Sequence, residues 1–142
     1  MKPLKRSVAL VIERPDDRVL LVRRPEDDES LPGLWGLPAT TLRDRESEPD
    51  ALRRAGREKL GVEVRPLHPL GEEEAERADY RIVMRDWQAE VASGDPSVPQ
   101  PGAGTQYVEL RWGHPTELRA AASAGSVCAR VLLRRRHLGS RG

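Results

Sequence analysis

The chain is short of cysteine, of long apolar runs and of net charge, and each shortage bears on the class of protein. Its single cysteine, Cys128, has no partner for an internal disulfide and cannot form a cysteine metal site, so a reducing cytoplasm is expected. The absence of a run of about 18 apolar residues excludes a membrane-spanning helix. A net charge of +1 is too small to argue for nucleic acid or an acidic membrane as the partner.

What is present is the composition of one globular domain. The 142 residues are 37% apolar and 33% charged, enough for a core and a well-solvated surface. The basic N-terminus is followed only by the short apolar run from Val8 to Ile12, which favours a strand over a signal peptide. No repeat or linker divides the chain, so residues 1–142 are expected to form a single domain.

Apolar runs and turn residues predict the order of the elements. Strands and helices alternate in one small domain, which indicates an α/β fold in which helices cover a mixed sheet. Two predictions concern turns: a hairpin closing at residues 15–17 and an acidic turn at 71–74. Strands are expected at 7–13, 19–22, 34–37, 62–67, 80–91 and 107–112, helices at 49–60, 115–122 and 127–136, and a long loop at 93–104.

The helix at 49–60 has the clearest boundaries. Ser47 suits the N-cap with Asp50 three residues later, and Gly61 is a natural stop. Gly56 in the middle of this helix costs about 1 kcal/mol relative to alanine. Close packing against the sheet is the expected reason for it.

The chemistry is concentrated between residues 31 and 64. The run Trp-Gly-Leu-Pro at 35–38 is followed by Glu46, Arg54, Glu58 and Gly61-Val62. This spacing resembles the signature of the Nudix family: glycine, five residues, glutamate, seven residues, then Arg-Glu-aliphatic-x-Glu-Glu-x-Gly-aliphatic. The flanking residues, and the closing strand and helix near the C-terminus, are similar as well, so the resemblance covers most of the chain.

The resemblance implies a Nudix α/β/α sandwich with a mixed central sheet, a divalent cation (Mg²⁺ or Mn²⁺) and a small nucleotide-type ligand. Carried over position by position, Glu58 and Arg54 are the expected catalytic residues. Glu58 and Glu46 are the expected metal ligands. Lys59 and Trp35 are the expected substrate contacts. Dimers are frequent among relatives, so a homodimer is a further expectation.

Three positions depart from the signature. Thr40 replaces its first glycine, Ala55 replaces the glutamate after the arginine, and Lys59 replaces the second paired glutamate. Positions 55, 58 and 59 share one face of a regular helix. In the family this face presents three carboxylates to the metal, whereas here it presents a methyl group, a carboxylate and an ammonium. A hard cation needs several oxygen ligands, so metal binding is expected to be weak or absent.

Several roles stay open at this point. Glu58 either binds metal or pairs with Arg54, one turn back. Glu46 either binds metal or ties the loop to the helix, and Lys59 is either a solvated lysine or a cation that holds a phosphate in place of the metal. Trp35 is either a core residue or a stacking surface. Replacement metal ligands are conceivable from Glu46, residues 72–74, Asp95 or Glu109.

Three hypotheses for function follow. The first is a metal-dependent pyrophosphohydrolase of a nucleoside diphosphate-linked substrate, with an altered metal site. The second is a catalytically silent module that binds or senses a nucleotide. The third is a purely structural interaction domain. Metal dependence of binding and of turnover discriminates between the first two.

Overall fold

The computed structural model describes residues 2–98 and 107–138, and every statement below refers to these ranges. Within them, no helix is long and apolar enough to cross a bilayer.

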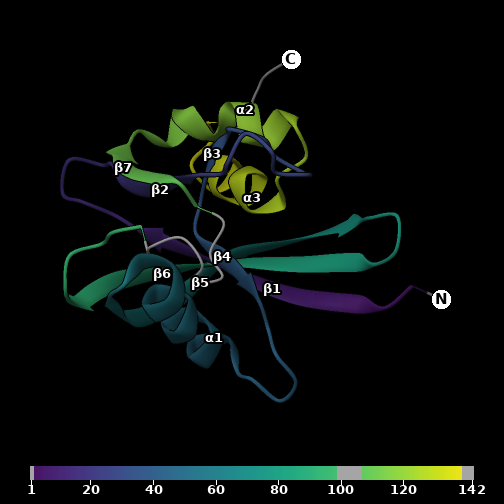
Figure 1. Ribbon diagram of the computed structural model, residues 1–142, viewed down its shortest axis with the longest axis horizontal. Coiled ribbons are helices and arrows are strands. Elements are labelled where there is room, and N and C mark those ends of the chain that lie inside the picture. The colour runs from purple at the N-terminus through teal and green to yellow at the C-terminus, as the bar shows by residue number, and fades with distance from the viewer. Residues whose placement is uncertain (1, 99–106, 139–142) are drawn as a thin grey trace.

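Two sheets form the framework (Figure 1). The larger sheet has the order β4-β1-β6-β5, and the smaller antiparallel sheet has the order β3-β2-β7. In the larger sheet β1 runs parallel to β6, whereas the β1–β4 and β5–β6 pairs are antiparallel, so the expected mixed sheet is confirmed. The strands are β1 (Leu4–Ile12), β2 (Val19–Arg23), β3 (Trp35–Gly36), β4 (Ala39–Thr41), β5 (Glu63–Glu76), β6 (Arg81–Ser93) and β7 (Glu109–Gly113).

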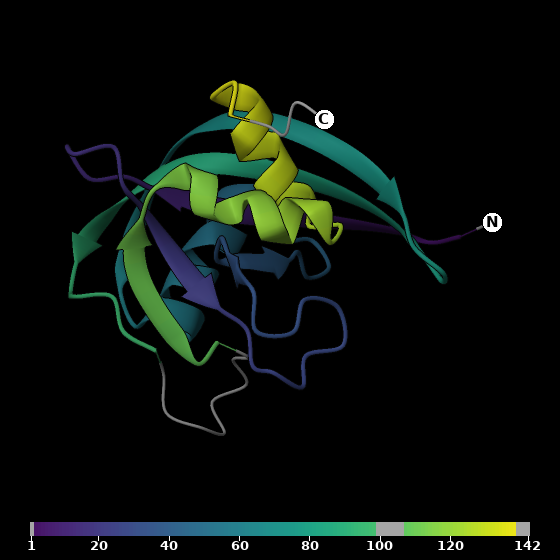
Figure 2. The same ribbon diagram turned by 90° about the horizontal axis from the view of Figure 1, so that it is seen from above.

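Helices cover both faces of the larger sheet. Helix α1 (Glu48–Ala55) and the π-helical turn η1 (Gly56–Leu60) lie on one face. The 3-10 turn η2 (Pro115–Leu118), α2 (Arg119–Ser123) and α3 (Val127–Arg135) lie on the other, together with the smaller sheet. Figure 2 shows β5 and β6 arching beneath α3 and extending beside the N-terminal strand. The α/β/α sandwich is confirmed.

Alternation along β1 divides the core into two clusters. Val8, Leu10 and Ile12 face α1, whereas Ala9 and Val11 face α3 and the smaller sheet. Both clusters therefore depend on the register of one buried strand, since a shift by one residue would exchange the two faces.

The boundaries of the first helix are as the sequence predicts. The Ser47 hydroxyl accepts a hydrogen bond from the Asp50 amide at 3.2 Å, and Gly61 ends the helical segment at φ 67°. A Cβ on Gly56 would lie 2.9 Å from Cγ1 of Val64, so the close packing expected there is confirmed. The last turn is π-helical rather than α-helical, which changes how positions 58 and 59 project relative to position 55.

The predicted acidic turn at residues 71–74 is wrong, because β5 continues through it to Glu76. Two of its glutamates are stabilised across the ladder: Glu72 pairs with Arg85 at 2.6 Å and Glu74 with Arg81 at 2.5 Å. The hairpin instead closes after β5, where the Arg77 amide donates to the Tyr80 carbonyl. Ion pairs with arginines of β6 favour a strand in this segment. A local sequence pattern does not show such pairs.

The predicted hairpin at residues 15–17 is correct as a turn and wrong as a strand pair. A single bridge joins Glu13 to Val19, and β1 and β2 then enter different sheets. Of the loop expected at 93–104, residues 99–104 lie outside the described residues. The helix expected at 115–122 is divided between η2 and α2.

Asp86 is the one acidic side chain inside the core among the described residues. It lies on β6 beneath α3 with no exposed surface, and neither carboxylate oxygen has a hydrogen-bond partner there. Burial raises the pKa of Asp86 well above its usual value; the charge of Arg134 lowers it and that of Glu73 raises it. The folded state therefore holds a proton that the unfolded chain releases at lower pH.

Replacing Asp86 with asparagine should stabilise the fold at neutral pH, by about 1–3 kcal/mol, because the cost of burying a carboxylate is removed. A folded pKa above the unfolded one makes wild-type stability fall as pH rises between the two values. The advantage of Asp86→Asn should therefore shrink as pH is lowered to 4. Urea unfolding at several pH values tests this, with exposed Asp79→Asn as control; an advantage independent of pH would contradict it.

Candidate functional site

Arg54 is the centre of a network of hydrogen bonds and ion pairs among the signature residues 46–59, here called the box. Its Nε and Nη2 each donate to a different carboxylate oxygen of Glu46 at 2.8 Å, and Nη2 also reaches the Thr41 carbonyl at 2.9 Å. Its Nη1 reaches the hydroxyl of Thr40, the residue in place of the signature's first glycine, at 3.2 Å. The side chains of Arg54 and Glu46 are only 11% and 14% exposed. This bidentate pair ties the loop after β4 to α1.

Both carboxylate oxygens of Glu46 therefore accept hydrogen bonds from within the protein. Besides Arg54, it accepts a hydrogen bond from the Arg43 amide at 2.9 Å. The Arg54 hydrogen bonds lower the pKa of Glu46 to about 2, against the opposing effect of burial and with help from the Arg43 amide. The geometry matches the structural role considered for this residue.

Glu58 lies on η1 and is 47% exposed. One oxygen is 3.3 Å from Nη1 of Arg54, and the other is 3.4 Å from Nη2 of Arg43. The carboxylate at the first paired-glutamate position thus lies between two guanidinium groups. Together with the Glu46 contacts, this makes a chain of alternating charges in which each carboxylate already has cationic partners.

Lys59 turns inward, away from solvent. Its Nζ donates to the Ala39 carbonyl at 2.5 Å and lies 5.3 Å from the centre of the Tyr107 ring. The Tyr107 hydroxyl accepts from the Ala39 amide at 3.0 Å, so all three residues meet at one point of β4. Burial, reinforced by Arg24 and Arg54 and opposed by Glu58, lowers the pKa of Lys59 to about 8.

The residues at the box do not fit a divalent cation. Ala55 is 1% exposed and packs in the core beneath α1, Glu58 is held by two arginines, and Lys59 places a positive charge at the third position. In residues 2–98 and 107–138, no group of three or more histidine, cysteine or acidic side chains is arranged to hold a metal. Hard cations need several oxygen ligands, which this arrangement does not offer.

Two of the outside carboxylates that were considered as replacement ligands, Glu73 and Glu109, are also in ion pairs. Glu73 pairs with Arg130 and Arg134 of α3 at 2.6 Å, and Glu109 pairs with Arg23 at 2.5 Å. Each lies on an element that places it beside arginine rather than beside Glu58.

Trp35 lies on β3 in the smaller sheet. The Arg111 guanidinium lies 4.2 Å from the centre of its ring, and the ring packs against the cluster beneath α3. The structure brings Arg54, Glu46, Glu58 and Lys59 together, whereas the contacts of Trp35 are with Arg111 and the cluster beneath α3.

A cavity of about 410 Å³ opens between the larger sheet and the turn that leads into α3. Its wall includes Ala39, whose carbonyl binds Lys59, and Arg24, whose charge acts on Lys59. The sequence analysis missed these residues, although alternation along β6 places Ile82 and Met84 on one face. The lining residues are Arg24, Ser30, Leu31, Ala39, Arg77, Tyr80, Ile82, Met84, Ala124, Gly125, Ser126, Val127 and Cys128.

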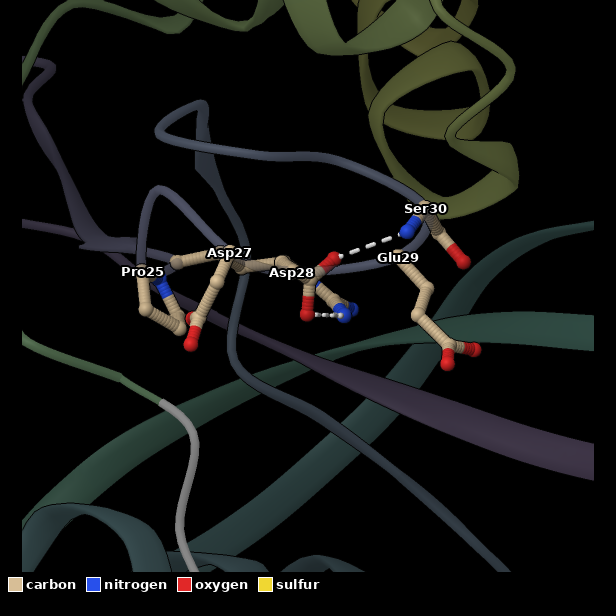
Figure 3. Close-up of a pocket in the computed structure, with 6 residues that line it drawn as sticks. Pro25, Asp27, Asp28, Glu29 and Ser30 are labelled. Atoms are coloured by element: carbon tan, nitrogen blue, oxygen red, sulfur yellow. Dashed lines mark hydrogen bonds and ion pairs between the residues drawn. The ribbon is translucent and has the colours of Figure 1, made fainter.

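Asp28 shapes the loop at the edge of this cavity (Figure 3). It accepts hydrogen bonds from the amides of Ser30 at 3.1 Å and Leu31 at 2.8 Å, and from Arg24 at 3.4 Å. Burial acts to raise the pKa of Asp28, but the Leu31 amide and the Arg24 charge together lower it. The loop thereby fixes Arg24, which lines both this cavity and the neighbouring hollow of about 430 Å³ drawn in Figure 3.

Comparisons with known proteins agree on the fold. A model of the NUDIX domain matches residues 3–134. Isopentenyl-diphosphate Delta-isomerase of Kocuria rhizophila is 30% identical over 129 residues, which cover 86% of this chain and 69% of that protein.

Solved structures are similar over almost the whole chain. The MutT protein from Methanosarcina mazei Go1 has a TM-score of 0.77 at 19% identity, with 96% of this chain and 95% of that chain covered, which shows the fold alone. A NUDIX hydrolase from Nitrosomonas europaea has a TM-score of 0.74 at 25% identity (96% and 89% covered). The E. coli ORF135 protein has a TM-score of 0.70 at 27% identity (94% and 92% covered).

Replacing Arg54 with methionine should lower the free energy of unfolding by about 2–4 kcal/mol, because Glu46 is left enclosed without its cationic partner. The matched control is Arg53→Met one residue earlier, where an exposed pair with Asp50 is lost, and a change below about 0.5 kcal/mol is expected. Urea denaturation measures both. Equal losses in the two variants would contradict a structural role for the Arg54 network.

Proposed function

The chain belongs to the Nudix family, and from this premise we propose that it binds a small molecule carrying a diphosphate without turning it over at a box metal. Nudix hydrolases generally use Mg²⁺ or Mn²⁺ and act on small nucleoside diphosphate-linked substrates. The observation that carries the proposal is a contrast between the box and the cavity that shares Ala39 with it. The carboxylates of the box are paired with arginines, whereas the cavity of about 410 Å³, whose wall includes the residue that binds Lys59, is open.

The cavity has the size and the mixed lining of a small-molecule site. Ile82, Met84 and Val127 provide apolar surface for a base or another uncharged group. Arg24 and Arg77 provide positive charge at its wall, which suits phosphate oxygens. The ligand class we propose is therefore a diphosphate joined to a group of moderate size, such as a nucleoside.

The relative from Kocuria rhizophila adds a second class of candidate ligand. Its name gives an isopentenyl diphosphate as the substrate of that protein. A prenyl diphosphate shares the diphosphate with nucleotide ligands and differs in the attached group. The chemistry that the two ligand classes share is thus the diphosphate. The binding experiment must therefore compare ligands that differ in the attached group.

Calorimetric titration in EDTA tests the proposal, with ADP-ribose, dGTP and isopentenyl diphosphate as ligands. At least one should bind without metal, and Ile82→Trp should abolish binding by filling the cavity. Leu67→Trp, at an exposed position on β5 outside the cavity, is the matched control and should bind as the wild type does. Binding that survives Ile82→Trp would place the ligand elsewhere and contradict the proposed site.

A second assay separates the proposal from the hydrolase alternative. Under the proposal, release of phosphate or nucleotide from the same ligands should be absent in Mg²⁺ and in Mn²⁺. Metal-dependent release that disappears in Glu58→Gln would overturn the silent-module proposal, because it would require a metal site rebuilt around Glu58.

A further inference from the structure

We infer that Lys59 supplies from the protein itself the positive charge that a metal ion supplies elsewhere in the family, so that the site holds a diphosphate and excludes the divalent cation. The inference rests on the proposed function and concerns the same site. It begins from the misfit between the box residues and a metal.

The first step is the position of the charge. Lys59 occupies the second paired-glutamate position, and its Nζ is fixed by the Ala39 carbonyl at 2.5 Å and by the face of the Tyr107 ring. An ordinary surface lysine would extend into water, where its side chain keeps its rotational freedom. Here the ammonium turns inward to the Ala39 carbonyl, and Ala39 also lines the cavity.

The second step is the local pairing of charges. Three carboxylates at the box and beside Arg24 each lie within 4 Å of an arginine. Among the described residues Lys59 forms no ion pair within that distance, so its ammonium has no carboxylate partner there. The carboxylates are Asp28, Glu46 and Glu58, and the arginines are Arg24, Arg43 and Arg54.

The third step is what this ammonium without an ion pair can bind. A lysine ammonium has three hydrogens, and the bond to Ala39 uses one of them. An approaching phosphate oxygen would find a charge-assisted donor beside Arg24, in a partly desolvated position where such bonds are strong. A divalent cation at the same place would meet an ammonium and two guanidinium groups, and Glu58 is already shared between Arg54 and Arg43. The same residues therefore attract the anion and repel the metal.

Two titrations test the inference, both on the full chain. The first follows inorganic pyrophosphate in EDTA by calorimetry. Lys59→Met should weaken its binding roughly tenfold or more, because a charge-assisted contact is lost. Arg57→Met is the matched control: it removes the same unit of charge two residues away, where the side chain is exposed and pairs with Glu63, and should change the affinity less than about twofold.

The second titration uses Mn²⁺ alone on the EDTA-stripped wild type and needs no variant, so it stands even if Lys59→Met folds poorly. No saturable Mn²⁺ binding is expected. Saturable binding that is lost in Glu58→Gln would overturn the inference, and so would pyrophosphate binding that is equal in Lys59→Met and the wild type. If the wild type binds neither pyrophosphate nor any ligand of the wider panel, the proposed function itself fails. Ligand binding that is insensitive to Lys59 leaves that function standing and removes only the role of this lysine.

Discussion

The bidentate pair between Arg54 and Glu46 is the contact on which the rest of the site depends. It joins the loop after β4 to the first helix, and the same arginine holds the Thr41 carbonyl and one oxygen of Glu58. Because both partners are largely enclosed, the pair is strong only while its geometry is maintained. It fixes the positions of β4 and η1, and therefore the point at which Lys59 meets Ala39.

This network explains how the fold persists after the metal carboxylates are lost. In a metal site of this kind, several carboxylates repel one another unless the cation is present. Here Ala55 replaces one of them and packs in the core, and Lys59 replaces another, so no such repulsion arises. The remaining carboxylates, Glu46 and Glu58, are neutralised by Arg54 and Arg43. Among the described residues the inward-facing ammonium of Lys59 has no ion pair and is held by the Ala39 carbonyl.

Carboxylates are also paired with arginines across the larger sheet. Glutamates of β5 pair with arginines of β6 and α3, which extends the strand through a segment whose glycine and acidic residues suggest a turn. Asp86 is the exception, since it lies beneath α3 with no partner for its oxygens among the described residues. In this sheet the glutamates of β5 are thus paired with arginines, and the buried carboxyl group of Asp86 has a raised pKa.

The sequence by itself determined the family, the mixed sheet between two helical layers and the boundaries of the first helix. These rest on local signals: the spacing of Glu46, Arg54, Glu58 and Gly61, the capping serine, and apolar runs of strand length. The substitutions at positions 55 and 59 were also visible in the sequence, and they predicted weak or absent metal binding.

Only the tertiary structure decided what the substituted residues do. The direction of the Lys59 side chain depends on the carbonyl of Ala39, 20 residues earlier, and on the ring of Tyr107 from a third part of the chain. The cavity is formed by residues of the loop after β2, of β4, of the β5–β6 hairpin and of the turn before α3, which no local pattern connects. Such contacts join distant segments, and their geometry is set by packing and charge pairing in three dimensions rather than by the order of neighbours along the chain.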